Sequence, residues 1–156
     1  MRTTVLMVIL VVVSGFIVLA RGDANGIHRS PVLQDPSPPS ASIVPDQLDF
    51  GDQVVGRRSK AKRITVTNAG GKPLYISSVT GDGDNWSDFS VVNDTCTGAT
   101  VAPNRSCIID VAFSPSDTDE RNASLSLGDN APDSPQTLSL TGNGINSQDV
   151  PPFISR

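Results

Sequence analysis

The run CIIDVAF at residues 107–113 decides the fold class. In an extended backbone its odd-numbered residues, which are all apolar, point to one face, while Asp110 points to the other. This two-residue period is typical of a half-buried β-strand. We therefore expect a strand here, with Phe113 as an anchor of the core.

Six further runs between about residues 43 and 145 show the same alternation, separated by clusters of Gly, Pro, Asn and Asp. They lie at residues 48–50, 63–68, 74–79, 88–92, 123–127 and 137–141. No stretch sustains the 3.6-residue apolar period of a helix. The pattern predicts an all-β, seven-stranded immunoglobulin-like sandwich rather than a barrel or a doubly wound fold.

The N-terminal segment predicts export. Residues 3–20 form an uncharged apolar run that follows Arg2, as in the positive and apolar regions of an export signal. We interpret residues 1–20 as a hydrophobic helix, either a signal peptide cleaved after Ala20 or an uncleaved anchor that tethers the chain to a membrane through residues 3–20. The expected location is therefore periplasmic, cell-surface or secreted.

Composition divides the rest of the chain into three parts. Residues 21–42 are rich in Pro, Ser and Gly and predict a flexible linker, residues 43–145 hold the alternating runs of the domain, and residues 146–156 form a C-terminal tail. The formal net charge of -4 and the dispersed basic residues argue against nucleic-acid binding.

The two cysteines predict one disulfide, Cys96 to Cys107. An even cysteine count in an exported chain favours pairing, because oxidising compartments preserve the bond and small domains gain stability from it. A redox site would need a C-x-x-C pair, and a zinc site would need four ligands. Neither pattern is present in the sequence.

Several short motifs occur in a fixed order: LDFG at 48–51, ITVTNAG at 64–70, PLYISSV at 73–79, IIDVAFSP at 108–115 and LSLTGNG at 138–144. Together they resemble the abnormal-spindle and hydin (ASH) type of Ig-like domain, called choice-of-anchor D in many bacterial surface proteins. The resemblance covers residues 44–144 and implies a sandwich related to the major sperm protein and pilus-chaperone folds. It also implies that the Asn68 side chain bonds backbone at a strand end and that Gly70 and Gly142 occupy positions with φ > 0.

Sequence patterns for catalysis and metal binding are weak. The only histidine, His28, lies in the linker, so no Ser-His-Asp triad can form in the domain. Asp117, Asp119 and Glu120 share one polar turn, which we interpret as solvated. The acidic loop Asp82–Asp88 departs from the EF-hand spacing, because Trp86 takes the third ligand position. We expect no enzyme activity, no metal and no cofactor.

Trp86 is the only tryptophan, and it has two interpretations. It either packs as a cap on one end of the sandwich or contacts a partner, as exposed aromatic residues do. The second interpretation predicts that Trp86→Ala weakens partner capture without lowering the melting temperature. Residues 57–63 carry the only basic cluster, interpreted as a solvated turn and strand, and four glycosylation sequons begin at Asn85, Asn93, Asn104 and Asn122.

Two functions follow from these observations. The first is a non-catalytic binding or structural module of the cell envelope or surface, which recognises a protein or a polysaccharide through loops or a sheet edge. The alternative is a chaperone-like or assembly role, in which an edge strand of the domain pairs with a client.

Overall fold

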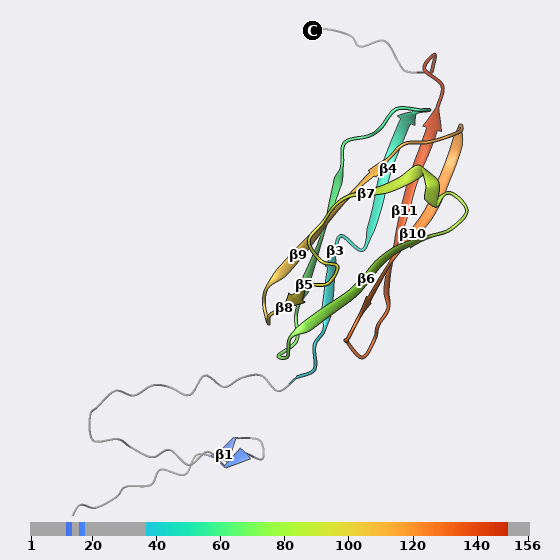
Figure 1. Ribbon diagram of the computed structural model, residues 1–156. Helices are drawn as coiled ribbons and strands as arrows, with labels where there is room; N and C mark the ends of the chain where they lie inside the picture. Colours follow the sequence, from blue (N-terminus) through green and yellow to red (C-terminus); the bar gives the residue numbers. More distant parts are fainter. Residues whose placement is uncertain (1–11, 14–15, 18–36, 150–156) are drawn as a thin grey trace, which may run out of the picture. The chain divides into compact units, whose positions relative to one another are not determined.

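The computed structural model of the protein describes residues 12–13, 16–17 and 37–149 (Figure 1). In the N-terminal part, β1 (Val12–Val13) pairs antiparallel with β2 (Phe16–Ile17). The helix expected over residues 3–20 lies outside the described residues except for these four, which are extended. Among the described residues no helix is long and apolar enough to cross a membrane.

The main part, residues 37–149, is a sandwich of two sheets (Figure 1). Its elements are β3 (Ala41–Val44), β4 (Gln47–Val54), β5 (Lys62–Asn68), β6 (Leu74–Asp82), the 3₁₀ helix η1 (Trp86–Asp88), β7 (Phe89–Asp94), β8 (Thr100–Val101), β9 (Ser106–Phe113), β10 (Asp119–Asp129) and β11 (Gln136–Ile145). One sheet has the order β4-β11-β10-β6-β8 and the other β3-β5-β9-β7. The predicted all-β sandwich is confirmed, and each of the seven predicted runs forms a strand. Two short strands, β3 and β8, are present in addition to them.

The chain passes from one sheet to the other between β3 and β4. β3 pairs antiparallel with β5, whereas β4, only two residues later, pairs parallel with β11. β3 begins at Ala41, two residues before the predicted start of the domain. β3 and β4 are therefore edge strands, one in each sheet.

The core lies between the sheets and follows the predicted alternation. Ile109, Val111 and Phe113 of β9 have no exposed surface, and the facing residues Leu125 and Leu140 are equally buried. The rings of Phe50, Phe89 and Phe113 form a cluster with centroid distances of 4.8 to 5.8 Å. Burial of such rings is a major source of stability in a domain of this size.

Asn68 is a buried polar residue at the end of β5, and its predicted role is confirmed. Its Nδ2 group donates to the carbonyls of Lys72 at 2.8 Å and Val101 at 2.9 Å, and its Oδ1 atom accepts from the Gly70 amide at 2.9 Å. The side chain is completely buried. One amide therefore satisfies backbone groups from the turn after β5 and from β8.

The prediction of positive φ at Gly70 and Gly142 was wrong. Among the described glycines, positive φ occurs at Gly51, Gly56, Gly83 and Gly98. Gly70 and Gly142 serve instead as points of close approach. A Cβ atom on Gly70 would lie 2.0 Å from the Pro38 carbonyl oxygen, and one on Gly142 would lie 2.5 Å from the Phe113 ring.

Candidate functional site

Trp86 lies in η1, in the connection between β6 and β7, and its ring packs against the sandwich. The Trp86 side chain is partly buried and contacts the hydrophobic core. It covers Gly81 of β6 so closely that a Cβ atom there would lie 2.0 Å from two indole carbons. The ring therefore fastens the β6–β7 loop to the sheet, which fits the interpretation of Trp86 as a cap. Its contact with a partner stays a prediction.

A shallow depression of about 440 Å³ lies beside this loop. It is lined by Gly83, Asp84, Asn85, Asn122, Ala123 and Ser124. Asn85 Oδ1 accepts a hydrogen bond of 2.9 Å from the Asn122 amide, so the loop is tied to β10. Within residues 37–149, no three His, Cys, Asp or Glu side chains converge as a metal ion would require.

Asp88 is the buried carboxylate of this end of the molecule. Asp88 was predicted to begin a strand, but it is the last residue of η1. Its side chain is 1% exposed. Arg121 Nε on β10 donates to its Oδ2 atom at 2.7 Å. Burial raises the pKa of this carboxyl, but hydrogen bonds from Ser116 and Arg121 outweigh it and hold the pKa below its usual value.

Sequence reasoning missed this ion pair. Arg121 lies 33 residues from Asp88 in the sequence, so no local pattern links the two residues. The available sequence signal for this ion pair was Arg121, a charged residue at a position of β10 where the alternation predicts an apolar one. The pair joins η1 to β10 and leaves neither group free for acid-base chemistry. Asp117, Asp119 and Glu120, the other carboxylates considered, are exposed to solvent, as predicted.

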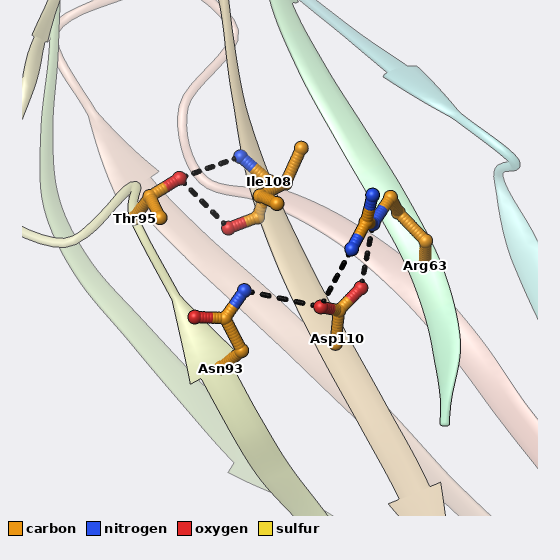
Figure 2. A network of polar contacts seen from close by, with 5 residues as sticks. All are labelled: Arg63, Asn93, Thr95, Ile108 and Asp110. Carbon is orange, nitrogen blue, oxygen red and sulfur yellow. Dashed lines mark hydrogen bonds and ion pairs between the residues drawn. The ribbon is translucent and has the colours of Figure 1, made fainter. Parts of the chain in front are cut away.

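A second polar network covers the outer face of the four-stranded sheet (Figure 2). Arg63 on β5 donates to both carboxylate oxygens of Asp110 on β9, at 2.8 and 3.0 Å, and Asn93 Nδ2 on β7 donates at 3.0 Å. The hydrogen bonds from Arg63 and then Asn93 lower the pKa of Asp110. Thr95 Oγ1 bonds both the amide and the carbonyl of Ile108. These groups satisfy one another, so this network is structural.

The basic cluster at residues 57–63 is solvated, as predicted. Its five cationic residues, Arg57, Arg58, Lys60, Lys62 and Arg63, are all exposed. Lys62 Nζ donates to the Asp49 carbonyl and lies 5.5 Å from the centre of the Phe50 ring.

The predicted disulfide is confirmed. Cys96 and Cys107 are bonded, with Cα atoms 5.1 Å apart, and both residues are buried. Asp94 Oδ1 accepts from the amides of Cys96 and Thr97, at 2.7 and 3.0 Å, which shapes the turn after β7. The bond holds the connection between β7 and β8 against β9.

Other residues named from the sequence have simple positions. His28 lies outside the described residues. Of the four sequon residues, Asn93 donates to Asp110, while Asn104 stands exposed at a turn with φ of 60°.

Comparison with known proteins places this geometry in a family. A sequence model described as HYDIN/CFA65/VesB-like, Ig-like domain matches residues 39–143. No curated protein matches the chain. The match agrees with the predicted resemblance to ASH-type domains and covers the sandwich from just before β3 to β11.

Solved structures share the fold. The VesB protease of Vibrio cholerae is 24% identical, with a TM-score of 0.52, over 66% of this chain and 31% of the protease. A protein of unknown function from Porphyromonas gingivalis W83 is 20% identical, with a TM-score of 0.57, over 74% of this chain and 51% of that one. The ASH/PapD-like domain 7 of human CEP192 is 12% identical, with a TM-score of 0.51, over 81% of this chain and 99% of that domain.

The share of each relative that is matched limits what the comparison shows. This chain spans about a third of VesB and a smaller part, 24%, of the secreted serine protease VesC of the same organism. The likeness is therefore to an Ig-like region and not to a whole protease. By its sequence and its fold, the chain belongs to the HYDIN/CFA65/VesB-like family of Ig-like domains.

Proposed function

We propose that this chain is a non-catalytic binding or structural module of an extracytoplasmic compartment, either released or tethered to a membrane by its apolar N-terminal run. The observation that carries the proposal is the buried disulfide Cys96–Cys107 in a small Ig-like domain. Such bonds persist in oxidising compartments and are rare in the cytosol. The apolar run at residues 3–20 supports the same location.

The pairing of the buried carboxylate Asp88 supports a non-catalytic role. Within residues 37–149, Asp88 is the one buried charged residue, and it is engaged by Arg121 and Ser116. Catalytic groups are usually perturbed and also accessible to a substrate. Asp88 is perturbed but closed off from solvent.

Binding through a broad face or a loop is favoured over pairing through an edge strand. Among the described edges, β3 has four residues and β8 has two. β4 and β7 are longer, with eight and six residues, but the register of each with its neighbour is interrupted. β4 shifts against β11 between Thr141 and Asn143, and β7 shifts against β9 between Val91 and Asn93, which leaves Val92 outside the ladder. Short strands and bulges are devices that prevent edge pairing. The chaperone-like alternative therefore has the weaker physical support.

Cell fractionation combined with thiol labelling tests the proposal. The full-length protein is expressed in a bacterial host, and each fraction is treated with a maleimide under denaturing conditions. We expect the protein in the envelope or the medium, with neither cysteine labelled before reduction. A cytosolic protein with two free thiols would refute the proposed location.

Cross-linking in the envelope tests the mode of binding. A Val92→Pro variant disturbs the accessible edge of β7 without removing a residue from the β7–β9 register. We expect its cross-linked products to match those of the wild type. Loss of a specific product in this variant alone would favour the edge-strand alternative.

A further inference from the structure

The outer face of the five-stranded sheet carries a field of hydroxyl groups. It comprises residues of three adjacent strands, which we call the hydroxyl face: Ser78 and Thr80 of β6, Ser124 and Ser126 of β10, and Thr137 and Ser139 of β11. Their side chains point outward because the alternate residues, such as Leu125 and Leu138, are buried in the core.

Strand register arranges these hydroxyl groups in rows. Ser126 is paired with Thr137 on one side and with Thr80 on the other, and Ser124 is paired with Ser139. Neighbouring strands lie about 4.8 Å apart, and residues two apart on a strand are separated by about 6.8 Å. The result is a regular array of short donors and acceptors with little side-chain entropy to lose.

These hydroxyl groups are free to bind. Within residues 37–149, none of the six side chains of the hydroxyl face makes a hydrogen bond to another group. The opposite face of the sandwich differs, because there Thr67 bonds Ser106 at 2.8 Å and Thr95 bonds Ile108. A partner on the hydroxyl face would therefore replace water rather than break internal bonds.

Charge on and around the face decides the kind of partner. β4, β6, β8 and β11 contain no Lys or Arg, and Arg121 of β10 is already paired with Asp88. Toward the C-terminal end of β11 the remaining charged residues of this sheet are acidic, namely Asp49, Asp52, Asp82, Asp119 and Glu120. The Lys62 ammonium of β5 reaches the edge of this border at the Asp49 carbonyl, so the border keeps a negative net charge. An anionic polymer would be repelled by this border, whereas an uncharged polyol would meet no unfavourable charge.

Tyr75 supplies an aromatic surface at the other end of the face. It precedes the buried Ile76 on β6, is paired with Thr100, and is 46% exposed, the most exposed aromatic side chain of the described residues. The Asn130 side chain accepts from its amide at 2.8 Å, which fixes the backbone beneath the ring. A tyrosine ring offers an apolar surface to the C–H groups of a sugar, with a hydroxyl at its tip.

We propose that the hydroxyl face together with Tyr75 binds a neutral polysaccharide. The sugar rings stack on Tyr75, and their hydroxyl groups exchange hydrogen bonds with the rows of Ser and Thr on β6, β10 and β11. This inference rests on the proposed function, because it names the partner class of the same non-catalytic module.

Sedimentation with insoluble polysaccharides tests the inference. The full-length protein is mixed with cellulose, chitin, β-1,3-glucan or mannan, and with calcium alginate as an anionic polymer. We expect at least one neutral polysaccharide to retain the protein and alginate to leave it in solution. Tyr75→Ala and Ser126→Glu should each lower retention at least tenfold, while Tyr75→Phe keeps it.

Thr65→Glu is the matched control, since Thr65 lies on β5 and faces solvent on the other sheet. It adds the same charge to a strand and should not change retention. Thermal unfolding of each variant checks that the fold is intact.

Two results would overturn the inference: no retention by any neutral polysaccharide, or equal losses in Ser126→Glu and Thr65→Glu. Either result leaves the proposed function standing if the protein is still exported with its disulfide formed. A cytosolic protein with free thiols would instead refute the proposed function.

Discussion

Replacement of Asn68 by alanine tests how much of the sandwich depends on one buried amide. Three hydrogen bonds of 2.8 to 2.9 Å are lost, to the Gly70 amide and to the carbonyls of Lys72 and Val101. Each contributes about 1 kcal/mol, and the backbone groups left behind are buried without partners. We therefore expect the Asn68→Ala variant to lose about 3 kcal/mol of unfolding free energy. That loss is a large part of the stability of a small domain.

Urea unfolding followed by tryptophan fluorescence measures this loss. Asn93→Ala is the matched control, because Asn93 is exposed and its side chain makes one hydrogen bond, to Asp110. It should cost at most about 0.5 kcal/mol. Equal midpoints for the two variants would refute the assignment of Asn68 as the residue that organises the β5 end of the domain.

Four further predictions follow from the same contacts. Replacing Cys96 and Cys107 by serine should lower the unfolding free energy by about 3 kcal/mol, because the disulfide joins residues that are 11 positions apart and restricts the unfolded chain. An unchanged urea midpoint would contradict this. Asp88→Asn should cost about 3 kcal/mol at pH 7, because a buried pair loses one charge. Because the pKa of Asp88 is lower in the folded than in the unfolded protein, the ionised carboxylate stabilises the fold fully above the unfolded-state pKa of about 4. This stabilisation is lost as the pH falls through the lower folded-state pKa, so the melting temperatures of the variant and the wild type should converge in acid. Gly142→Ala, which places a methyl group 2.5 Å from a core ring, should lower the unfolding free energy by about 2 kcal/mol, and a gain in stability would show that the core has room there. Trp86→Ala should cost about 2 kcal/mol by calorimetry, since the ring is partly buried; an unchanged melting temperature would restore the interpretation of Trp86 as a contact residue only.

The chain's local patterns predicted most of the sandwich. Alternation in runs such as residues 107–113 identifies strands and their inner faces, because a strand with one buried face needs an apolar residue at every second position. Two cysteines in a chain with an apolar leader predicted the disulfide for a similar local reason, the redox compartment. These features depend on neighbours in sequence or on composition, so they can be recognised without coordinates.

Contacts between distant segments were beyond the reach of these patterns. Gly70 and Gly142 were predicted to occupy positions with φ > 0, but their missing side chains instead make room for Pro38 and Phe113. The pair Asp88–Arg121 depends on how η1 approaches β10. The interpretation of Trp86 as a packed cap also depends on Gly81 of β6, because the indole ring lies where a side chain at residue 81 would be. This contact forms only when the loop folds back over β6.

By itself, the sequence determined that this chain forms an all-β domain, which residues of each strand face the core, and that its cysteines pair. Tertiary structure alone decided which strands are neighbours, and hence that hydroxyl groups from β6, β10 and β11 form one surface. The physical reason is that side-chain alternation is a property of a single extended strand, whereas a surface depends on the register between strands, here between Ser126 and both Thr137 and the distant Thr80.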